Sequence, residues 1–328
     1  MTKKIAFFFP GQGSQSVGMM AGFGDNPVIK QTFIEASDIL KTDFWAMATE
    51  PNELLNQTQN TQPLMLIAGI ATYRAYIQAG GLQPQGLSPQ NIPAKAGYSY
   101  VKPNIHAGHS LGEYTALVAS NALSFADALP LVKFRAEAMQ SAVPEGVGAM
   151  AAILGLDDDA VRAVCLEAAQ AEVCEAVNFN SPGQVVIAGN KAAVERGMEL
   201  AKAKGAKRAL ALPVSVPSHC ALMRPAAEKL AEYLKNVTIN TPQISVIHNA
   251  DVAAYNDAAQ IKDALVRQLY SPVRWVEILQ AIHAQGFTNS AECGPGKVLA
   301  GLTKRIIADL PCTALTSNEA ISEFINNN

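Results

Sequence analysis

A serine between two glycines is the first candidate for chemistry in this sequence. Ser110 lies in Gly-His-Ser-Leu-Gly, residues 108–112, after a short β-like run and before a helical one. At a strand-to-helix turn of this kind, small flanking residues let the backbone turn tightly and expose the serine hydroxyl. The N–H of Leu111, at the start of the following helix, is then available to stabilise an oxyanion. The same pattern also suits a serine that caps a helix, so both roles remain open.

A nucleophilic serine needs a base, and the sequence offers five histidines. His219 differs from the others because it lies on a predicted loop, in PVSVPSHCALM, that leads back to the main sheet. Loops held by a rigid scaffold often carry catalytic residues. No carboxylate is clearly placed to orient this histidine. Asp251 and a backbone carbonyl within residues 267–270 are the two candidates.

Two glycine-rich segments resemble nucleotide-binding loops, and the first of them raises the rival hypothesis of a nucleotide-binding oxidoreductase. FPGQGSQSVGM, residues 9–19, follows the first predicted strand, but Ser16 stands where a dinucleotide loop needs its third glycine. ECGPGKVLAG contains Lys297 after a glycine, but Val298 replaces the serine or threonine of a phosphate loop. Both segments are better interpreted as turns near the rim of a sheet, which weakens this rival.

Arg135 is a charged residue within an apolar helical stripe. In LPLVKFRAEAMQ it shares one helix face with Leu131, Val132 and Met139. Such an arginine pairs with an internal acid, extends its charged end to solvent, or binds a ligand anion. From the residues alone, the two structural roles are favoured over ligand binding.

The composition is that of a folded α/β protein. The 328 residues are 49% hydrophobic and 16% charged, with a net charge of -3, so the chain lacks the basic excess of a nucleic-acid-binding protein. No apolar run approaches the ~18 residues of a membrane helix, and the N-terminal run is too short for a signal peptide. We therefore expect a cytoplasmic protein. Its five cysteines are scattered without a C-x-x-C pair, so neither a disulfide framework nor a metal site is predicted.

Two patterns of strands and helices divide the chain. Residues 145–211 have the order strand, helix, strand, strand, helix, strand of a ferredoxin-like unit, with NSPGQ, residues 180–184, as its hairpin turn. Residues 1–144 and 212–328 alternate strands with helices, which predicts a mostly parallel sheet covered on both faces. We expect an α/β fold with a discontinuous large domain and an inserted small subdomain. Residues 81–104, rich in Pro, Gln and Gly, predict a long surface loop.

Five motifs together resemble the malonyl-CoA:acyl-carrier-protein transacylases of bacterial type II fatty-acid synthesis. They are FPGQGSQ, GHSLGEY, NFNSPGQ, PVSVPSH and GPGKVL, and the similarity runs almost end to end in the same order. The resemblance implies an α/β-hydrolase-like large domain and a ferredoxin-like small subdomain, with the active site in the cleft between them. It also implies a stand-alone enzyme rather than one module of a polyketide synthase.

The resemblance assigns catalytic roles to three residues. Ser110 matches the nucleophile and His219 matches the base. Gln268 matches the residue whose main-chain carbonyl holds the histidine in place of a third acid. The implied reaction carries a malonyl group from malonyl-CoA, through a malonyl-serine ester, to the phosphopantetheine thiol of acyl carrier protein.

The resemblance also assigns the residues that bind the acyl group. Gln12 matches the donor of a second oxyanion N–H beside Leu111, and Arg135 matches the arginine that binds the malonyl carboxylate. No metal or other cofactor is implied, the carrier protein is a transient partner, and a monomer is expected. A serine hydrolase or thioesterase on the same elbow is the alternative, which a cation in the acyl pocket disfavours. Pro130, in the helix of Arg135, and the long loop over 81–104 depart from the family's pattern.

Overall fold

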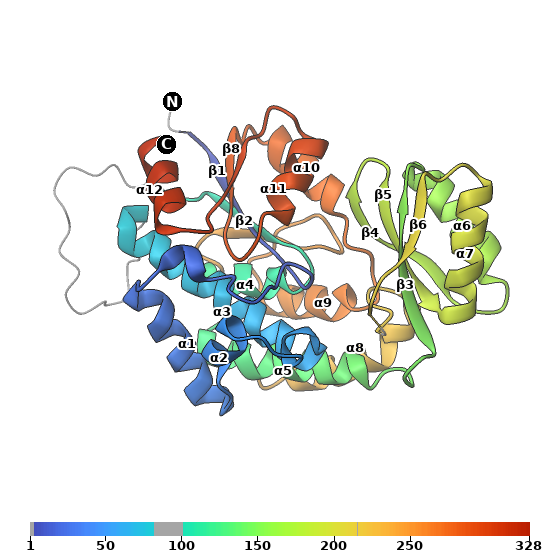
Figure 1. The fold of residues 1–328 in the computed structure, drawn as a ribbon, viewed down its shortest axis with the longest axis horizontal. Helices are drawn as coiled ribbons and strands as arrows, with labels where there is room; N and C mark the ends of the chain where they lie inside the picture. Colours follow the sequence, from blue (N-terminus) through green and yellow to red (C-terminus); the bar gives the residue numbers. More distant parts are fainter. Residues whose placement is uncertain (1–2, 82–100, 215) are drawn as a thin grey trace.

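Two β-sheets, each with its own helices, make up this protein (Figure 1). The computed structural model describes residues 3–81, 101–214 and 216–328. The larger sheet and its helices fill the left and centre of Figure 1, and the smaller sheet lies on the right. The loop predicted over residues 81–104 falls mostly on residues 82–100, which lie outside the described residues.

The larger sheet has five parallel strands in the order β7-β2-β1-β8-β9. They are β1 (Ile5–Phe9), β2 (Ile105–Gly108), β7 (Ser245–Ile247), β8 (Asn289–Glu292) and β9 (Cys312–Ala314). β1 takes the central place because its sequence IAFFF is apolar at every position, and all five residues are buried. The predicted parallel sheet is confirmed.

Helices cover both faces of this sheet. Successive side chains of a strand point to opposite faces, so Phe7 and Phe9 of β1 lie in one apolar cluster while Ala6 and Phe8 lie in another. The first cluster contains residues of α1 (Pro27–Leu40), α2 (Phe44–Thr49), α3 (Thr58–Tyr76), α4 (Gly112–Ala119), α5 (Phe125–Gln140), α8 (Arg224–Leu234), α9 (Ala258–Gln268) and α12 (Asn318–Asn326). The second contains residues of α10 (Trp275–Ala284) and α11 (Val298–Ile306).

The smaller sheet is antiparallel, with the strand order β4-β5-β3-β6. Its elements in chain order are β3 (Gly148–Leu154), α6 (Asp158–Ala169), β4 (Cys174–Ser181), β5 (Gln184–Asn190), α7 (Lys191–Ala203) and β6 (Arg208–Ala211). The predicted β-α-β-β-α-β order is therefore confirmed. The hairpin turn within NSPGQ contains Gly183 at a φ of 71°, a conformation that glycine adopts without steric cost.

One edge of the smaller sheet is joined to the rest of the molecule by backbone hydrogen bonds. The N–H of Phe179 in β4 donates to the carbonyl of Val273, 3.0 Å away, and the N–H of Val273 donates to the carbonyl of Val177 at 2.8 Å. Val273 lies between α9 and α10. The segment that follows α9 is thereby fixed against the small sheet, next to the residues of the candidate site.

Candidate active site

The serine of the G-x-S-x-G motif lies on a sharp turn between β2 and α4. Ser110 has a φ of 50°, in the left-handed region that non-glycine residues seldom adopt. Both flanking positions require glycine for a steric reason. A Cβ on Gly108 would lie 1.9 Å from the carbonyl carbon of Gly112, and a Cβ on Gly112 would lie 2.0 Å from the carbonyl oxygen of Phe9. The turn is too close to β1 and to itself for any side chain at these two positions.

Ser110 and His219 lie within hydrogen-bond distance of each other. The serine Oγ is 2.8 Å from Nε2 of His219, and Nδ1 of the same ring is 2.7 Å from the backbone carbonyl of Gln268. A carbonyl oxygen only accepts, so Nδ1 carries the ring proton and Nε2 is free to accept the serine proton. His219 itself has a φ of 68°, and its N–H donates to the carbonyl of Leu269 at 3.0 Å.

The surroundings of His219 favour its neutral form. Burial, and after it the positive charge of Arg135, lower the pKa of the imidazole to about 3, while the hydrogen bond to the Gln268 carbonyl acts in the opposite direction. The ring is therefore uncharged at neutral pH, as a general base must be before it accepts a proton.

Asp251, the carboxylate candidate for orienting the base, is engaged elsewhere. Its two carboxylate oxygens accept from the guanidinium of Arg267, one of them at 2.6 Å from Nη2, and the hydroxyl of Tyr255 donates to it at 3.0 Å. The Arg267 hydrogen bond lowers the pKa of the Asp251 carboxyl. Of the two candidates left open by the sequence, the carbonyl of Gln268 is the one in contact with His219.

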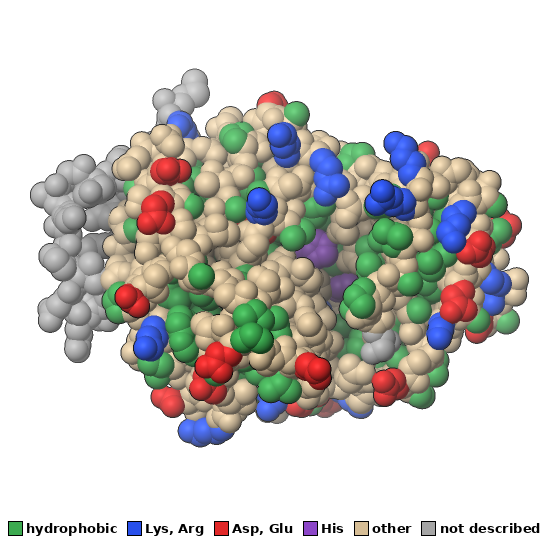
Figure 2. Space-filling view, in the orientation of Figure 1, with side chains coloured by type: hydrophobic (Ala, Val, Ile, Leu, Met, Phe, Trp, Pro, Cys, Tyr) green, Lys and Arg blue, Asp and Glu red, His purple; other side chains and the backbone are tan. Residues whose placement is uncertain are grey.

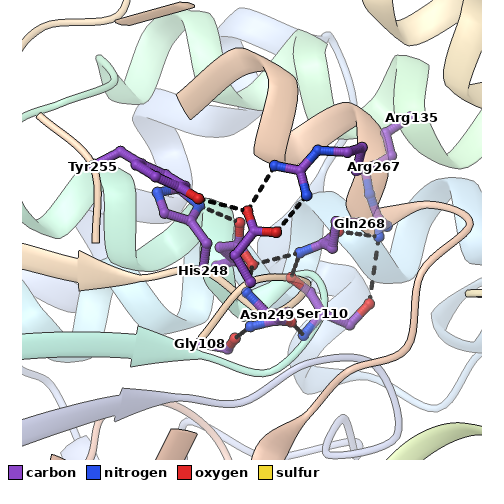
Figure 3. A network of polar contacts seen from close by, with 10 residues as sticks. Gly108, Ser110, Arg135, His248, Asn249, Tyr255, Arg267 and Gln268 are labelled. Carbon is purple, nitrogen blue, oxygen red and sulfur yellow. Dashed lines mark hydrogen bonds and ion pairs between the residues drawn. The ribbon is translucent and has the colours of Figure 1, made fainter. Parts of the chain in front are cut away.

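Arg135 is buried beside the serine, with 1% of its surface exposed. Its Nη2 is 3.4 Å from Ser110 Oγ and donates to Oε1 of Gln268 at 2.9 Å (Figure 3). Its Nη1 donates to Oε1 of Gln62 at 2.8 Å. Burial lowers the pKa of the guanidinium. α5 continues past Pro130, so the proline does not separate Arg135 from its helix. Arg135 neither pairs with an internal acid nor extends its charged end to solvent. The two structural roles that the residues favoured therefore do not describe its environment.

The two N–H groups expected to stabilise an oxyanion lie on segments that contact each other. A Cβ on Gly11, in the loop after β1, would lie 2.4 Å from the carbonyl of His109, so this loop packs against the serine turn. Within the described part of the chain, neither the N–H of Leu111 nor that of Gln12 donates a hydrogen bond. Both groups therefore remain available to an oxygen atom of a ligand.

The turn also touches the small sheet. The Nε2 of His109 is 2.8 Å from Oδ1 of Asn180 in β4, so this ring is directed to the small sheet. Figure 2 shows histidine side chains inside a hollow between the two sheet regions. The serine turn therefore lies where the two parts of the molecule meet.

Three buried polar residues of the site were not identified from the sequence. Gln62 binds Arg135, Asn249 binds the backbone of Ser110, and Glu113 binds Asn249 and Gln268. Gln62 gave a signal, because a glutamine next to the apolar run PLMLIAGI is unusual inside a buried helix. Glu113 gave no such signal, since its partners are remote in sequence.

The two glycine-rich segments do not form nucleotide loops. After β1 the chain makes turns and a short 3-10 helix, Ala21–Phe23, rather than entering a long helix directly. At the start of α11, the Glu292 carboxylate accepts from the N–H of Ala300 at 2.8 Å, in the position that a bound phosphate would need. Both observations weaken the oxidoreductase hypothesis.

Residues 3–81, 101–214 and 216–328 hold no group of three or more His, Cys, Asp and Glu side chains placed to bind a metal ion. Among the helices that the structure describes, none has the length and apolarity needed to cross a membrane.

A serine and a histidine joined in this way, on a strand–turn–helix elbow of a parallel sheet, define a class of α/β enzymes that transfer or hydrolyse acyl groups. Residues 94–311 match the model of the acyl transferase domain. Two malonyl CoA-acyl carrier protein transacylases, from Haemophilus influenzae and from Escherichia coli K12, are 52% and 51% identical to this chain. The alignments cover 98% and 97% of this chain and 99% and 98% of those proteins.

Solved structures support the same family assignment. An acyl-carrier-protein S-malonyltransferase from Burkholderia pseudomallei is 57% identical, with a TM-score of 0.91 over 98% of this chain and 99% of that one. A malonyl-transacylase solved in complex with a type II PKS acyl-carrier protein is 48% identical, with a TM-score of 0.92 over 99% of this chain and 100% of that chain. The chain belongs to the acyl transferase family, among its malonyl CoA-acyl carrier protein transacylases.

Proposed function

We propose that this chain transfers a malonyl group from malonyl-CoA to the phosphopantetheine thiol of an acyl carrier protein, through a malonyl ester on Ser110, for fatty-acid synthesis. The observation that carries this proposal is that one hydroxyl contacts both a neutral base and a buried cation. Ser110 Oγ is 2.8 Å from His219 Nε2 and 3.4 Å from Arg135 Nη2. The base activates the hydroxyl, and the cation suits an acyl group that ends in a carboxylate.

In the first half-reaction His219 accepts the proton of Ser110 while Oγ attacks the thioester carbonyl of malonyl-CoA. The tetrahedral intermediate then collapses and its C–S bond breaks. The coenzyme A thiolate leaves with the proton that His219 holds, and the malonyl-serine ester remains. The carbonyl of Gln268, 2.7 Å from Nδ1, keeps the ring in the orientation that this proton transfer requires.

The second half-reaction reverses these steps with another thiol. The phosphopantetheine thiol of the carrier gives its proton to His219 and attacks the ester carbonyl, and the C–O bond to Ser110 breaks as Oγ recovers the proton. Both steps build negative charge on one carbonyl oxygen. The N–H groups of Leu111 and Gln12 bind that oxygen, and each contributes about 3 kcal/mol to transition-state stabilisation by analogy with other oxyanion holes.

Intact-mass spectrometry tests this proposal directly. Mixing the protein with malonyl-CoA should give a malonyl adduct that maps to Ser110, and Ser110→Ala should give none. Initial rates with both substrates varied should give parallel lines in double-reciprocal plots. Intersecting lines would instead indicate direct transfer without the ester.

The hydrolase alternative is separated by a second measurement. A transacylase releases coenzyme A in amounts equal to the enzyme until holo acyl carrier protein is added, whereas a thioesterase releases it continuously. Continuous release without carrier, at the rate of transfer, would favour the thioesterase. The pocket cation supports transfer, because Arg135 offers two parallel N–H groups to a malonyl carboxylate.

We also propose that the enzyme is a cytoplasmic monomer that binds no nucleic acid, with a large domain of residues 1–144 and 212–328 and a small one of residues 145–211. The net charge of -3 supports the absence of nucleic-acid binding, because such binding relies on an excess of basic residues. The grouping of β3 to β6 with α6 and α7 supports the proposed division into two domains. Light scattering at micromolar concentration tests the monomer, and the mass of a dimer would contradict it.

A further inference from the structure

The backbone of Ser110 is held on both sides by buried amide side chains. Its N–H donates to Oδ1 of Asn249 at 2.7 Å, and its carbonyl accepts from Nε2 of Gln268 at 2.9 Å. Nδ2 of Asn249 donates in turn to the carbonyl of Gly108 at 2.7 Å, so one side chain spans the turn (Figure 3). A left-handed backbone at a residue other than glycine persists only where its surroundings hold it. Asn249 and Gln268 are the groups that do so here.

A single carboxylate ties these two amides together. Glu113 is completely buried, and its Oε2 accepts from the backbone N–H of Asn249 at 2.9 Å and from Nε2 of Gln268 at 3.0 Å. Its Oε1 is 2.7 Å from Nδ1 of His248. A carboxylate that receives three N–H groups is fixed firmly, because each bond removes a direction in which it can move.

The same network reaches every side chain proposed for the reaction. Gln268 contacts His219 through its backbone carbonyl, at 2.7 Å, and Arg135 through its side-chain oxygen, at 2.9 Å. Its side-chain nitrogen is bound to Glu113 and to the carbonyl of Ser110. The base, the nucleophile and the cation are therefore all hydrogen-bonded to Gln268. Gln268 is in turn hydrogen-bonded to the carboxylate of Glu113.

We propose that Asn249 and Glu113 are positioning residues, which hold the backbone of Ser110 so that its hydroxyl faces His219. The proposal rests on the proposed function, in which Ser110 carries the acyl group. Neither residue contacts Ser110 Oγ by a hydrogen bond within the described part of the chain, so both act through the peptide groups around it. Their loss should slow acylation and leave the binding of malonyl-CoA nearly unchanged.

Asn249→Ala is the first test variant. Without the amide, the N–H of Ser110 and the carbonyl of Gly108 lose their partners and the turn relaxes. A displacement of this kind near reacting atoms lowers the rate about a hundredfold. The rate of malonyl-enzyme formation at saturating malonyl-CoA, measured by quenched-flow mass spectrometry, should fall by that factor. The concentration for half-maximal rate should change less than about threefold. Acylation by acetyl-CoA should fall by the same factor as acylation by malonyl-CoA.

Asp251→Asn is the matched control. It lies two residues further along the same loop and also removes a polar contact, but its partners Arg267 and Tyr255 do not touch Ser110. Its acylation rate should stay within about threefold of wild type. A loss of about a thousandfold, as when a true triad acid is removed, would contradict the assignment of the Gln268 carbonyl as the partner of His219.

Glu113→Gln is the second test variant, and it keeps the shape of the side chain. An amide group in this position accepts fewer of the three N–H groups, so both half-reactions should slow about tenfold and by equal factors. Melting curves come first, and rates are compared only at temperatures where every variant is fully folded.

The outcomes separate this proposal from the function on which it rests. If wild-type protein forms no malonyl adduct, the proposed function is wrong. If wild type forms the adduct and folded Asn249→Ala forms it within about threefold of the wild-type rate, the positioning role is wrong. A rise in the half-maximal concentration with an unchanged maximal rate would also overturn it, and so would the failure of both variants to fold.

Discussion

Arg135 is the residue whose environment says most about the substrate. Its guanidinium is 1% exposed, and its hydrogen-bond partners among the described residues are two amide oxygens and a hydroxyl, none of them charged. The buried carboxylate of Glu113 acts on this cation from a distance and contacts Gln268 rather than Arg135. A buried cation without a directly paired counter-ion is unfavourable. The amides of Gln62 and Gln268 hold the group in place without neutralising it. We propose that a ligand carboxylate is the partner that completes this site.

Arg135→Ala should change selectivity more than it changes the reactivity of Ser110. The malonyl carboxylate loses its buried partner, so kcat/KM for malonyl-CoA should fall at least about a hundredfold, equivalent to about 2.7 kcal/mol. Acetyl-CoA lacks that carboxylate, and its kcat/KM should change little or rise. Arg135→Lys should lie between, nearer to Ala, because an ammonium cannot form two parallel hydrogen bonds to a carboxylate.

Initial rates with both CoA thioesters check this prediction. Gln62→Leu is an informative companion, because it removes one partner of Arg135 without touching Ser110 or His219. It should lower the malonyl rate selectively, in the same direction as Arg135→Ala. Equal losses with malonyl-CoA and acetyl-CoA would mean that Arg135 is structural and that another group binds the carboxylate.

At the scale of single elements, the turn between β2 and α4 depends on its glycines. In Gly112→Ala the new methyl group would lie 2.0 Å from the Phe9 carbonyl oxygen, which belongs to the central strand. Overpacking against backbone of this kind should cost about 3 kcal/mol of unfolding free energy, at the upper end of such effects. The acylation rate of the folded fraction should fall as well, because the turn carries Ser110.

Gly301→Ala in α11 is the control for that substitution. A Cβ at this position has no atom within 4 Å in the described part of the chain, and alanine stabilises a helix by up to about 1 kcal/mol over glycine. Chemical denaturation of both variants gives the comparison. Similar unfolding free energies for the two would show that the turn adjusts to a side chain at 112.

The elements follow from local patterns in the sequence, and most of them are predictable. The all-apolar run IAFFF predicts the central strand, and G-x-S-x-G predicts the turn, because each pattern is set by neighbouring residues. The network around Ser110 is different. Glu113 and Asn249 are 136 positions apart, and their contact depends on how β7 and α4 pack. No local pattern records such a contact, so these residues were missed.

The role of Arg135 was also beyond what local sequence patterns can predict. Its helical stripe is visible in the sequence, but the stripe cannot reveal that its partners, Gln62 and Gln268, are uncharged. The residues alone therefore favoured a structural role, and only the family resemblance indicated a ligand. The orienting group of His219 was open for a related reason, since a backbone carbonyl leaves no mark in the sequence.

At the scale of the whole molecule, the family resemblance implies that the carrier protein is acidic, and its docking would then need local positive charge on a chain of net charge -3. Two exposed basic pairs are candidates for this docking: Lys207, just before β6, with Arg208 in β6, and Lys304 with Arg305 in α11. α11 lies against β4, whereas β6 forms the opposite edge of the small sheet. The two pairs are therefore separate sites and need separate tests.

Reversing each pair to glutamate should identify the docking surface. The pair that contacts the carrier should, when reversed, weaken carrier turnover and reduce its dependence on salt, because fewer charges attract across the interface. Malonylation by malonyl-CoA should be unaffected. The other pair is then the matched control. Equal losses in both half-reactions, or no loss with either pair, would exclude these residues from docking.

Buried histidines should make this fold sensitive to acid. Burial lowers the pKa of His106 and of His219 to about 3, so each stays neutral in the folded protein while the unfolded chain takes up a proton below about pH 6.5. A lowered folded pKa contributes stability above the unfolded pKa, and this stability is lost as pH falls through the folded pKa. The free energy of unfolding should therefore decrease between about pH 6.5 and pH 3.

His106→Leu isolates one of these contributions without touching the candidate site. The ring is buried among Phe7, Phe9 and Tyr73. The variant should reduce the slope of stability against pH by about 1.4 kcal/mol per unit between pH 3 and 6.5. Urea titrations at several pH values measure it, with His283→Leu on α10, 39% exposed, as the control. An unchanged slope would refute the assignment.

The order of strands in the two sheets has a consequence for how the chain acquires its structure. β1 pairs with β2 and with β8, which lie about a hundred and nearly three hundred positions away, whereas the small sheet pairs strands within residues 148–211. Distant pairings form slowly, because long segments must first be brought together. In pulse-labelled hydrogen exchange during refolding, amides of β3 to β5 should become protected before those of β1. The large sheet would then form beside a small sheet that is already built, and the serine turn would be among the last parts to reach its final geometry.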